Sequence, residues 1–386
     1  MKYTKEIRFV IERLEAAGHE AYLVGGALRD ALLGREANDF DVTTSATPAE
    51  MKAVFADEKT VETGLKHGTL TVLVDRTSIE VTTFRVDGEY LDARHPQSVR
   101  FTRSLAEDLA RRDFTVNAMA YNEKTGLVDL YGGKEDLARG LIRAVGEPAL
   151  RFREDALRIL RAFRFSAKLG FAIEEKTLAA ARECREGLRK VSAERVSAEL
   201  RGILMGKDAH RALALMDACG VLSLVLPEAR VDERIASLSA CFEMRLAFLL
   251  RGVEETALAA RLYALRLSNA EADAVKRLVR EVSDFVPCES AGEVRRLMAK
   301  TGALFEPLLE ILAALGVSVD LLRDTSALCR ARGDCLTVKE LAVDGRDLLA
   351  LGIKGRAVGE TLEALLERVL DDPSLNERET LLSLVK

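Results

Sequence analysis

The sequence predicts an α/β domain with a small mixed sheet, followed by a long region built only from helices. Up to about residue 140, short apolar and β-branched runs alternate with segments of helical periodicity. From about residue 150 onward Ala, Leu, Arg and Glu dominate, and strand-like runs almost vanish. The 386 residues also exceed one typical domain, so we expect two or three packed units.

The hydrophobic pattern gives the N-terminal elements in order. Residues 7–17 have the spacing of an amphipathic helix, and residues 27–33 read as a second helix that Gly34 ends. In the C-terminal region, glycine and proline residues separate one predicted helix from the next. Four runs rich in apolar, β-branched or aromatic residues predict strands over 21–24, 40–43, 69–74 and 79–84.

Composition argues against a membrane-spanning protein, a secreted protein and a cysteine zinc protein. No run approaches the roughly 20 apolar residues of a membrane span, and residues 1–6 lack the apolar core of a signal peptide. The six cysteines are scattered and form no CxxC pair, which argues against a cysteine zinc site and favours a reduced, cytoplasmic protein. The net charge is -5, but one short window is rich in arginine and predicts an RNA-facing patch: Arg139, Arg143, Arg151, Arg153, Arg158, Arg161 and Arg164.

A pair of carboxylates is the strongest chemical signal. Asp39 and Asp41 are two residues apart on a predicted strand, so their side chains project from the same face. Adjacent carboxylates repel each other unless a cation lies between them, and hard oxygen ligands suit Mg²⁺. Glu80 lies early on a strand that can pair with residues 40–43 and offers a third carboxylate. We predict Asp39 and Asp41 as magnesium ligands, and all three as catalytic residues of two-metal nucleotidyl transfer.

A glycine turn precedes these carboxylates. Gly25 and Gly26 open a helix directly after a strand, so backbone N–H groups and the positive end of the helix dipole can face a triphosphate. Arg29 lies one turn further along and can reach the same phosphates. A DxD or a Gly-Gly pair alone is common in turns, but here the two follow one another within about twenty residues.

Several segments resemble the class II tRNA nucleotidyltransferases and bacterial poly(A) polymerases of the polymerase β superfamily. Residues 23–44 resemble motif A, residues 111–120 (RRDFTVNAMA) motif B, and residues 154–158 (EDALR) motif D. Residues 129–146 and 192–200 also match, as the head–neck link and a neck helix. The resemblance implies a polymerase β-like catalytic head over residues 1–140, a helical, base-reading neck over 141–205, and a helical, tRNA-binding body and tail over 206–386.

The resemblance also implies a reaction: template-independent addition of C, C and A to the 3′ end of tRNA, with CTP and ATP as substrates and Mg²⁺ as cofactor. The expected partner is the tRNA 3′ end and acceptor arm, bound by a monomer or a dimer. None of the four histidines is followed by Asp, so no fused phosphohydrolase is expected. The implied nucleotide contacts come from motif B and from motif D with its helix: Arg112, Asp113, Asn117, Asp155, Arg158, Arg161 and Arg164.

Asp155 and Arg158 can choose between bases by hydrogen bonding. They are three residues apart on a predicted helix, so their side chains are expected to be neighbours. Cytosine and adenine can each donate an amino proton to Asp155, whereas guanine and uracil present a carbonyl oxygen. Each group left unpaired costs about 1–3 kcal/mol, so the pair selects C and A without separating them. Arg161 stays near this helix face, whereas Arg164 is about half a turn from Asp155 and is expected to contact a phosphate or support other groups.

The segment 85–96 bears on which nucleotides are added. It is polar, contains Gly and Pro and has no apolar period, so we predict a mobile loop. Relatives restricted to adding CC lack much of this loop. Its presence favours full CCA addition or A addition.

Other functions stay open at this point. An A-adding enzyme with a separate CC-adding partner shares all these motifs. A poly(A) polymerase would carry a basic stretch where this chain has residues 64–69, and an RNA-binding protein with an inactive head would have lost a carboxylate. Motif B argues against a nucleotide-sugar transferase. In the tail, Lys354 and Arg356 around Gly355 form either an RNA phosphate contact or a packing element.

Overall fold

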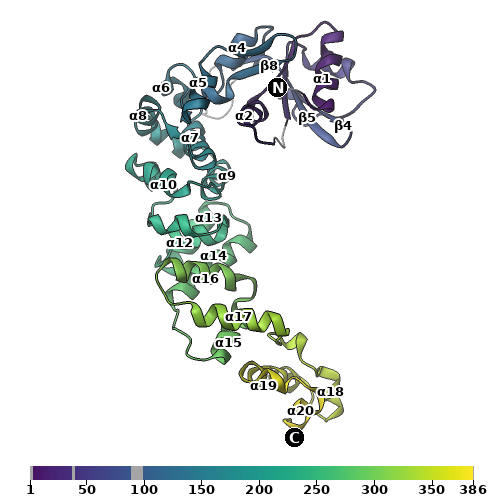
Figure 1. Cartoon of the computed structure of the whole chain (residues 1–386), viewed down its shortest axis with the longest axis vertical. Coiled ribbons are helices and arrows are strands. Elements are labelled where there is room, and N and C mark those ends of the chain that lie inside the picture. The colour runs from purple at the N-terminus through teal and green to yellow at the C-terminus, as the bar shows by residue number, and fades with distance from the viewer. Residues whose placement is uncertain (1–2, 37–39, 88–98, 386) are drawn as a thin grey trace. The chain divides into compact units, whose positions relative to one another are not determined.

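The computed structural model describes residues 3–36, 40–87 and 99–385. The chain forms two compact units: an N-terminal unit of Met1–Val231 with Ala264–Arg266, and a C-terminal unit of Asp232–Tyr263 with Leu267–Lys386. The sheet belongs to the N-terminal unit, and the C-terminal unit is helical throughout its described residues (Figure 1). No helix within the described ranges has the length and apolar character needed to cross a membrane.

A seven-stranded mixed sheet forms the centre of the head. Its strand order is β3-β4-β5-β2-β1-β8-β9, and every neighbouring pair is antiparallel except β2 and β5, which are parallel. The strands are β1 Ala21–Val24, β2 Phe40–Thr44, β3 Lys59–Val61, β4 Thr69–Val74, β5 Thr77–Thr83, β8 Met119–Asn122 and β9 Gly126–Asp129.

The four strands predicted from apolar runs are all present, and the mixed α/β head is confirmed. The sequence pattern missed β3, β8 and β9. β3 is short, its first and last side chains are exposed, and it begins with a lysine. β9 begins with a glycine and is half-buried along its length, so neither strand gives a clear alternating pattern.

Helices cover the sheet and continue beyond it. α1 buries Ile7, Val10, Ile11 and Leu14 on one face, as its helical spacing predicts, and Thr4 caps its first turn. The other helices of the N-terminal unit are α2 Gly25–Leu32, α3 Pro48–Val54, α4 Leu105–Ala110, α5 Gly133–Arg139, α6 Pro148–Glu154, α7 Leu157–Leu169, α8 Glu175–Cys184, α9 Ala193–Leu204, α10 Ala209–Ala218 and α11 Leu222–Val225, after α1 Lys5–Ala16.

Two expectations about irregular and helical segments were wrong in part. The segment expected to be a loop from residue 85 starts with strand β6 (Arg85–Asp87), which pairs with β7 (Val99–Phe101); the rest of that segment lies outside the described residues. The region expected to be all-helical contains β11 (Ala172–Ile173), parallel to β10 (Leu141–Ile142). Two-residue strands carry too few side chains to show a period.

The C-terminal unit is a stack of helices. A small apolar core near its end joins α19 and α20 to the segment before α18 through Val343, Leu365, Val369 and Leu381. Arg295 on α15 is buried and ion-paired with Asp334 at 3.0 Å. The helices are α12 Phe242–Leu249, α13 Glu255–Ala264, α14 Asn269–Ser283, α15 Ala291–Thr301, α16 Phe305–Ala314, α17 Asp320–Arg332, α18 Gly345–Ala350, α19 Arg356–Asp371 and α20 Arg378–Ser383.

One carboxylate at the start of the C-terminal unit makes its stability depend on pH. Hydrogen bonds from Arg234, together with the charges of Arg234 and Arg251, lower the pKa of Asp232 from 3.8 to about 2. Because the folded pKa is depressed, the stabilisation is present above about pH 4 and is lost as the pH falls towards 2. We expect Asp232→Asn to lower the free energy of unfolding by about 1–2 kcal/mol at pH 7 and to show little of this loss at pH 2.

Urea unfolding of the full chain at both pH values measures the effect of Asp232→Asn. Asp273→Asn is the control, because that side chain is exposed and meets Arg277 only at 3.9 Å. Equal losses for the two variants at pH 7 would contradict the prediction.

Candidate active site

One cavity of about 810 Å³ in the N-terminal unit gathers the predicted site residues. Its wall comes from the end of β1, the start of α2, the strands β2 and β5, motif B, α7 and α9. Asp39 lies outside the described residues. Every other residue predicted for catalysis or nucleotide binding lines this cavity: Gly25, Gly26, Arg29, Asp41, Glu80, Arg112, Asp113, Asn117, Asp155, Arg158, Arg161 and Arg164.

Two carboxylates face the cavity from neighbouring strands. Asp41 on β2 is the register partner of Glu80 on β5, and partners in a parallel pair project from the same face. The predicted pairing of these strands is therefore confirmed. Within the described ranges, no three His, Cys, Asp or Glu side chains form a cluster suited to a metal ion. The metal-ligand role of Asp41 stays a prediction, as does that of Asp39.

The glycine turn lies against the same carboxylate. α2 begins at Gly25 directly after β1, as predicted, and Gly25 has φ +67°. A Cβ at this position would lie 3.0 Å from Oδ2 of Asp41. Gly25 is required for two reasons, its left-handed backbone and the close approach of the carboxylate.

We expect Gly25→Ala to reduce nucleotide transfer about 10- to 100-fold, because the added methyl group displaces the Asp41 carboxylate. Gly34→Ala is the matched control: Gly34 has φ +69°, but a Cβ there would meet nothing within 4 Å. Both variants strain the backbone, and only the first disturbs Asp41. Steady-state rates with thermal melting curves separate the two effects, and equal losses of activity would contradict the prediction.

Arg29 lies deeper than the sequence suggested. Its side chain is 3% exposed. Its guanidinium pairs with Asp30 at 2.8 Å, donates to Oδ1 of Asn117 at 2.8 Å, and lies 5.3 Å from the centre of the Phe165 ring. In this arrangement Arg29 holds Asn117, and its predicted contact with phosphates stays untested.

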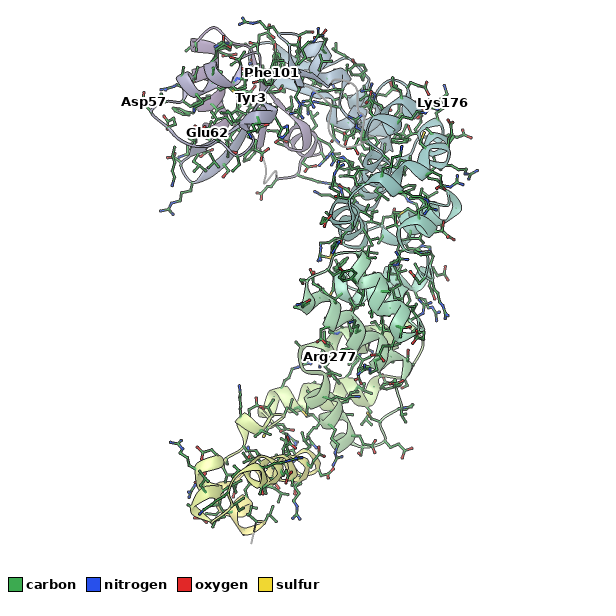
Figure 2. The ribbon with its side chains drawn as sticks, turned by 180° about the vertical axis from the view of Figure 1, so that it is seen from behind. Tyr3, Asp57, Glu62, Phe101, Lys176 and Arg277 are labelled. Atoms are coloured by element: carbon green, nitrogen blue, oxygen red, sulfur yellow. The ribbon has the colours of Figure 1, made fainter. Side chains whose placement is uncertain are left out.

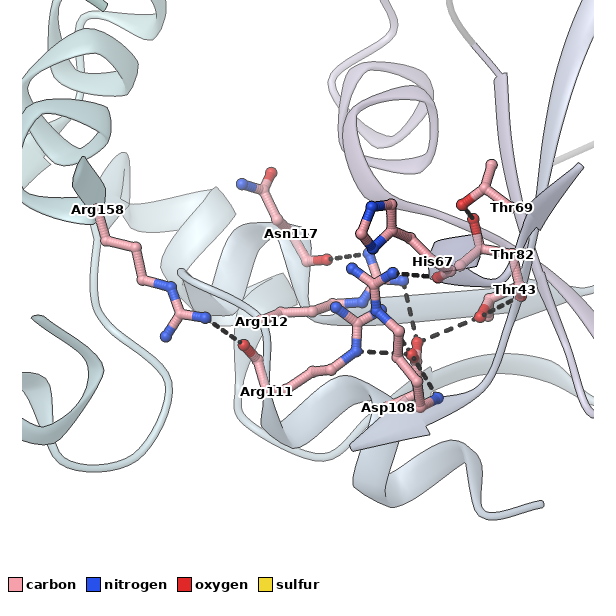
Figure 3. A network of polar contacts seen from close by, with 10 residues as sticks. Thr43, His67, Thr69, Thr82, Asp108, Arg111, Arg112, Asn117 and Arg158 are labelled. Atoms are coloured by element: carbon pink, nitrogen blue, oxygen red, sulfur yellow. Dashed lines mark hydrogen bonds and ion pairs between the residues drawn. The ribbon is translucent and has the colours of Figure 1, made fainter. Parts of the chain in front are cut away.

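A buried carboxylate that the sequence analysis missed organises motif B. Asp108 on α4 is 0% exposed and pairs with Arg111 at 2.7 Å and Arg112 at 3.2 Å (Figure 3). Thr43 on β2 also donates to it at 3.2 Å. Burial alone would raise the pKa of Asp108, but the charges of both arginines outweigh burial and hold it below its usual value. Its spacing of three and four residues from the two arginines was the available signal.

Asp113 and Asn117 form a second group in motif B. Asp113 accepts hydrogen bonds from Nδ2 of Asn117 at 3.2 Å and from Nε of Arg161 at 2.7 Å. Burial raises the pKa of Asp113, but the charge of Arg161 and these hydrogen bonds outweigh it, so the net pKa is lowered. Asp113 is thus a buried anion that ties motif B to α7.

The predicted helix carrying Asp155 and Arg158 is interrupted. α6 ends at Glu154, Asp155 has extended backbone (φ -141°, ψ 103°), and α7 begins at Leu157. The expectation that both residues lie on one helix was wrong. Arg158 pairs with Glu154 at 2.6 Å, whereas Oδ2 of Asp155 accepts from Nη2 of Arg195 on α9 at 2.7 Å. Both side chains still line the cavity.

The prediction that Arg164 lies about half a turn from Asp155 assumed one continuous helix. That assumption does not hold, because Asp155 is not part of α7. Arg164 lines the cavity together with Arg161. Both face Glu199 on α9: Arg164 donates to it at 2.5 Å, and Arg161 lies 3.8 Å from it. Arg195 and Glu199 are four residues apart, so one face of α9 supports Asp155, Arg161 and Arg164. The sequence analysis matched residues 192–200 to a neck helix but assigned no role to Arg195 or Glu199.

Comparisons with known proteins agree with this geometry. Residues 21–143 match the family model described as the poly A polymerase head domain, and residues 170–232 match the probable RNA and SrmB-binding site of polymerase A. The CCA-adding enzyme of Limosilactobacillus fermentum is 39% identical over 393 residues, which cover 97% of this chain and 94% of that protein. The CCA-adding enzyme of Geobacillus kaustophilus is 38% identical, covering 96% and 93%.

The chain belongs to the CCA-adding enzyme family. The resemblance read from motifs A, B and D is therefore confirmed. A solved structure of the Bacillus stearothermophilus CCA-adding enzyme in complex with CTP matches with a TM-score of 0.81 and 34% identity, covering 100% of this chain and 97% of that one. The tRNA-bound Thermotoga maritima CCA-adding enzyme, 23% identical with a TM-score of 0.70, shares the fold.

Proposed function

We propose that this family member adds C, C and A, one after another, to the 3′ end of tRNA without a nucleic-acid template, using CTP and ATP. The observation that carries the proposal is the cavity of about 810 Å³, which brings together residues from motifs A, B and D. Relatives named as CCA-adding enzymes match over nearly the whole chain, which supports the same reaction.

The donor set fits Mg²⁺. Asp41 and Glu80 present carboxylate oxygens from one face of adjacent strands, and hard oxygen ligands are those that Mg²⁺ prefers. Asp39, two residues before Asp41, is the further ligand we propose. When bound, Mg²⁺ would supply charge stabilisation at the transferring phosphorus and lower the pKa of the attacking hydroxyl.

The residues of this chain would hold the nucleotide at three points. The N–H groups at the start of α2, after Gly25 and Gly26, would face the triphosphate. Arg112 would bind the ribose or phosphates, and its Nε–H is buried with no hydrogen-bond partner among the described residues. Asp155 would accept the amino proton of cytosine or adenine, while Arg158 would donate to the ring edge.

The proposed tRNA contacts lie in the helical remainder. We keep the division into a head to residue 140, a neck to residue 205, and a tRNA-binding body and tail after it as part of the proposal. The two compact units, which divide at residue 231, are defined by how the chain packs against itself. They do not test the functional division into head, neck, body and tail. A cytoplasmic location and a monomeric or dimeric form also stay predictions.

Product length on a gel tests the function. The purified chain with Mg²⁺ is given tRNAs that lack CCA, CA or only A, together with CTP, ATP or both. Ordered extension of all three to a mature end that stops there is the expected result. Extension only of the tRNA ending in CC would instead assign A addition, and a growing A ladder would assign poly(A) synthesis. Binding of tRNA without extension would assign an inactive head.

A further inference from the structure

The cavity extends beyond the proposed nucleotide contacts. Past Glu80 it is lined by Thr69, Thr82 and Arg85, which are not among the residues that we propose to hold the incoming nucleotide. Thr82 follows Glu80 by two residues on β5, and Thr69 on β4 is its register partner. Their hydroxyl groups lie 3.0 Å apart. Together they form a polar row beside the carboxylates, on the same face of the sheet.

Strand order places this row on a particular side of the carboxylates. Across the sheet the order is β4, β5, β2 and β1. The glycine turn follows β1, Asp41 and Glu80 lie on β2 and β5, and Thr69 lies on β4. The turn and Thr69 are therefore on opposite sides of the carboxylates, and Thr82 shares strand β5 with Glu80.

The chemistry assigns a different reactant to each side. In nucleotidyl transfer, the 3′-hydroxyl oxygen that attacks the α-phosphorus and the pyrophosphate oxygen that leaves it lie roughly in line through the phosphorus. If the triphosphate, and hence the leaving pyrophosphate, lies at the glycine turn, the attacking hydroxyl must approach from the side of β5 and β4.

An exposed aromatic ring lies beside Arg85, which lines this end of the cavity. Phe101 on β7 is the register partner of Arg85 on β6, so both side chains project from the same face of the β6–β7 pair. Phe101 is 38% exposed and lies on the head, where Figure 2 labels it. Its ring packs on Gly68, where a Cβ would lie 2.7 Å from a ring carbon. Nη1 of Arg85 donates to the carbonyl oxygen of His67 at 2.6 Å, which fixes the guanidinium beside the cavity (Figure 3 shows His67).

We propose that Arg85, Phe101, Thr69 and Thr82 form the binding site for the 3′-terminal nucleotides of the RNA that is extended. Phe101 provides a face for a base to stack on, which any base can use, as a growing C, C, A end requires. Arg85 binds a phosphate, and the threonine hydroxyls face the ribose. The inference rests on the proposed nucleotidyl transfer and assigns its second substrate.

Separate titrations of the two substrates test this site. With tRNA ending in CC and Mg²⁺, the KM for tRNA is measured at saturating ATP, and the KM for ATP at saturating tRNA. Phe101→Leu keeps an apolar side chain but removes the aromatic face, so we expect the KM for tRNA to rise about 5- to 100-fold while the KM for ATP changes less than about twofold. Phe101→Trp should stay close to the wild type. Arg85→Gln should raise the KM for tRNA and flatten its dependence on salt.

Matched surface variants serve as controls. Val61→Ala changes an exposed apolar residue on β3, and Arg103→Gln an exposed arginine that is paired with Glu50; neither residue belongs to the proposed site. Melting curves identify any variant that fails to fold. If Phe101→Leu and Arg85→Gln behave like the controls, or raise the KM for ATP as much as that for tRNA, the inference is wrong and CCA addition by the wild type still stands. If the wild type extends no tRNA, both the proposed CCA addition and the proposed binding site for the RNA 3′ end are wrong.

Discussion

Replacement of Asp41 by asparagine is expected to slow nucleotide transfer at least about 1000-fold, the largest effect that we predict for a single substitution. Asparagine keeps the size of the side chain and removes its charge. Asp41 lies beside both Glu80, its register partner, and Gly25, whose backbone approaches its carboxylate. A neutral group in this position can neither share a divalent cation with Glu80 nor stabilise charge at phosphorus.

Single-turnover rates with tRNA ending in CC measure the effect of Asp41→Asn. Glu80→Gln should also lower the single-turnover rate. Asp57→Asn is the control, because Asp57 is exposed in the turn after α3 (Figure 2) and does not line the cavity. Raising the Mg²⁺ concentration should recover part of the activity of the variants if weakened metal binding is the cause. A rate for Asp41→Asn within tenfold of the wild type would refute the assignment of Asp41 as a catalytic carboxylate.

Residues whose role depends on short-range spacing could be predicted from the sequence. Gly25 and Gly26 follow a buried strand directly, and Asp41 lies on an apolar run that pairs with the strand of Glu80. Alternation and turn chemistry are local, so the amino-acid pattern determines them. The same reasoning gave the mixed sheet and the helical remainder.

The roles of two carboxylates that hold the arginines of the site could not be predicted from local sequence patterns. Asp108 and Glu199 each lie on a helix rich in charged residues, where an acid near an arginine is usually a surface pair of little consequence. Both are buried, and burial depends on which elements pack together: Thr43 against α4, and α7 against α9. The break at Asp155 is similar, because no glycine or proline marks it, and the backbone leaves the helix where Asp155 meets Arg195.

This contact with Arg195 changes how base selection should respond to mutation. If Asp155 and Arg158 formed one pair, removal of either would release the other. Instead Arg158 is held by Glu154, and Asp155 by Arg195. We expect Asp155→Asn to raise the use of UTP and GTP relative to CTP and ATP about 5- to 150-fold, because an amide can donate to a carbonyl oxygen where a carboxylate cannot.

Arg195→Gln should relax selection in the same direction but by a smaller factor, because the Asp155 carboxylate remains and loses only the donor that orients it. Arg189→Gln is the control, since Arg189 is exposed and pairs only on the surface with Glu186. Competition between nucleotides on one tRNA measures the ratio for each variant directly. If Arg195→Gln lowers the rate with all four nucleotides equally, α9 contributes to stability alone. A selective gain for UTP and GTP would instead mean that a helix outside motif D sets the orientation on which base choice depends.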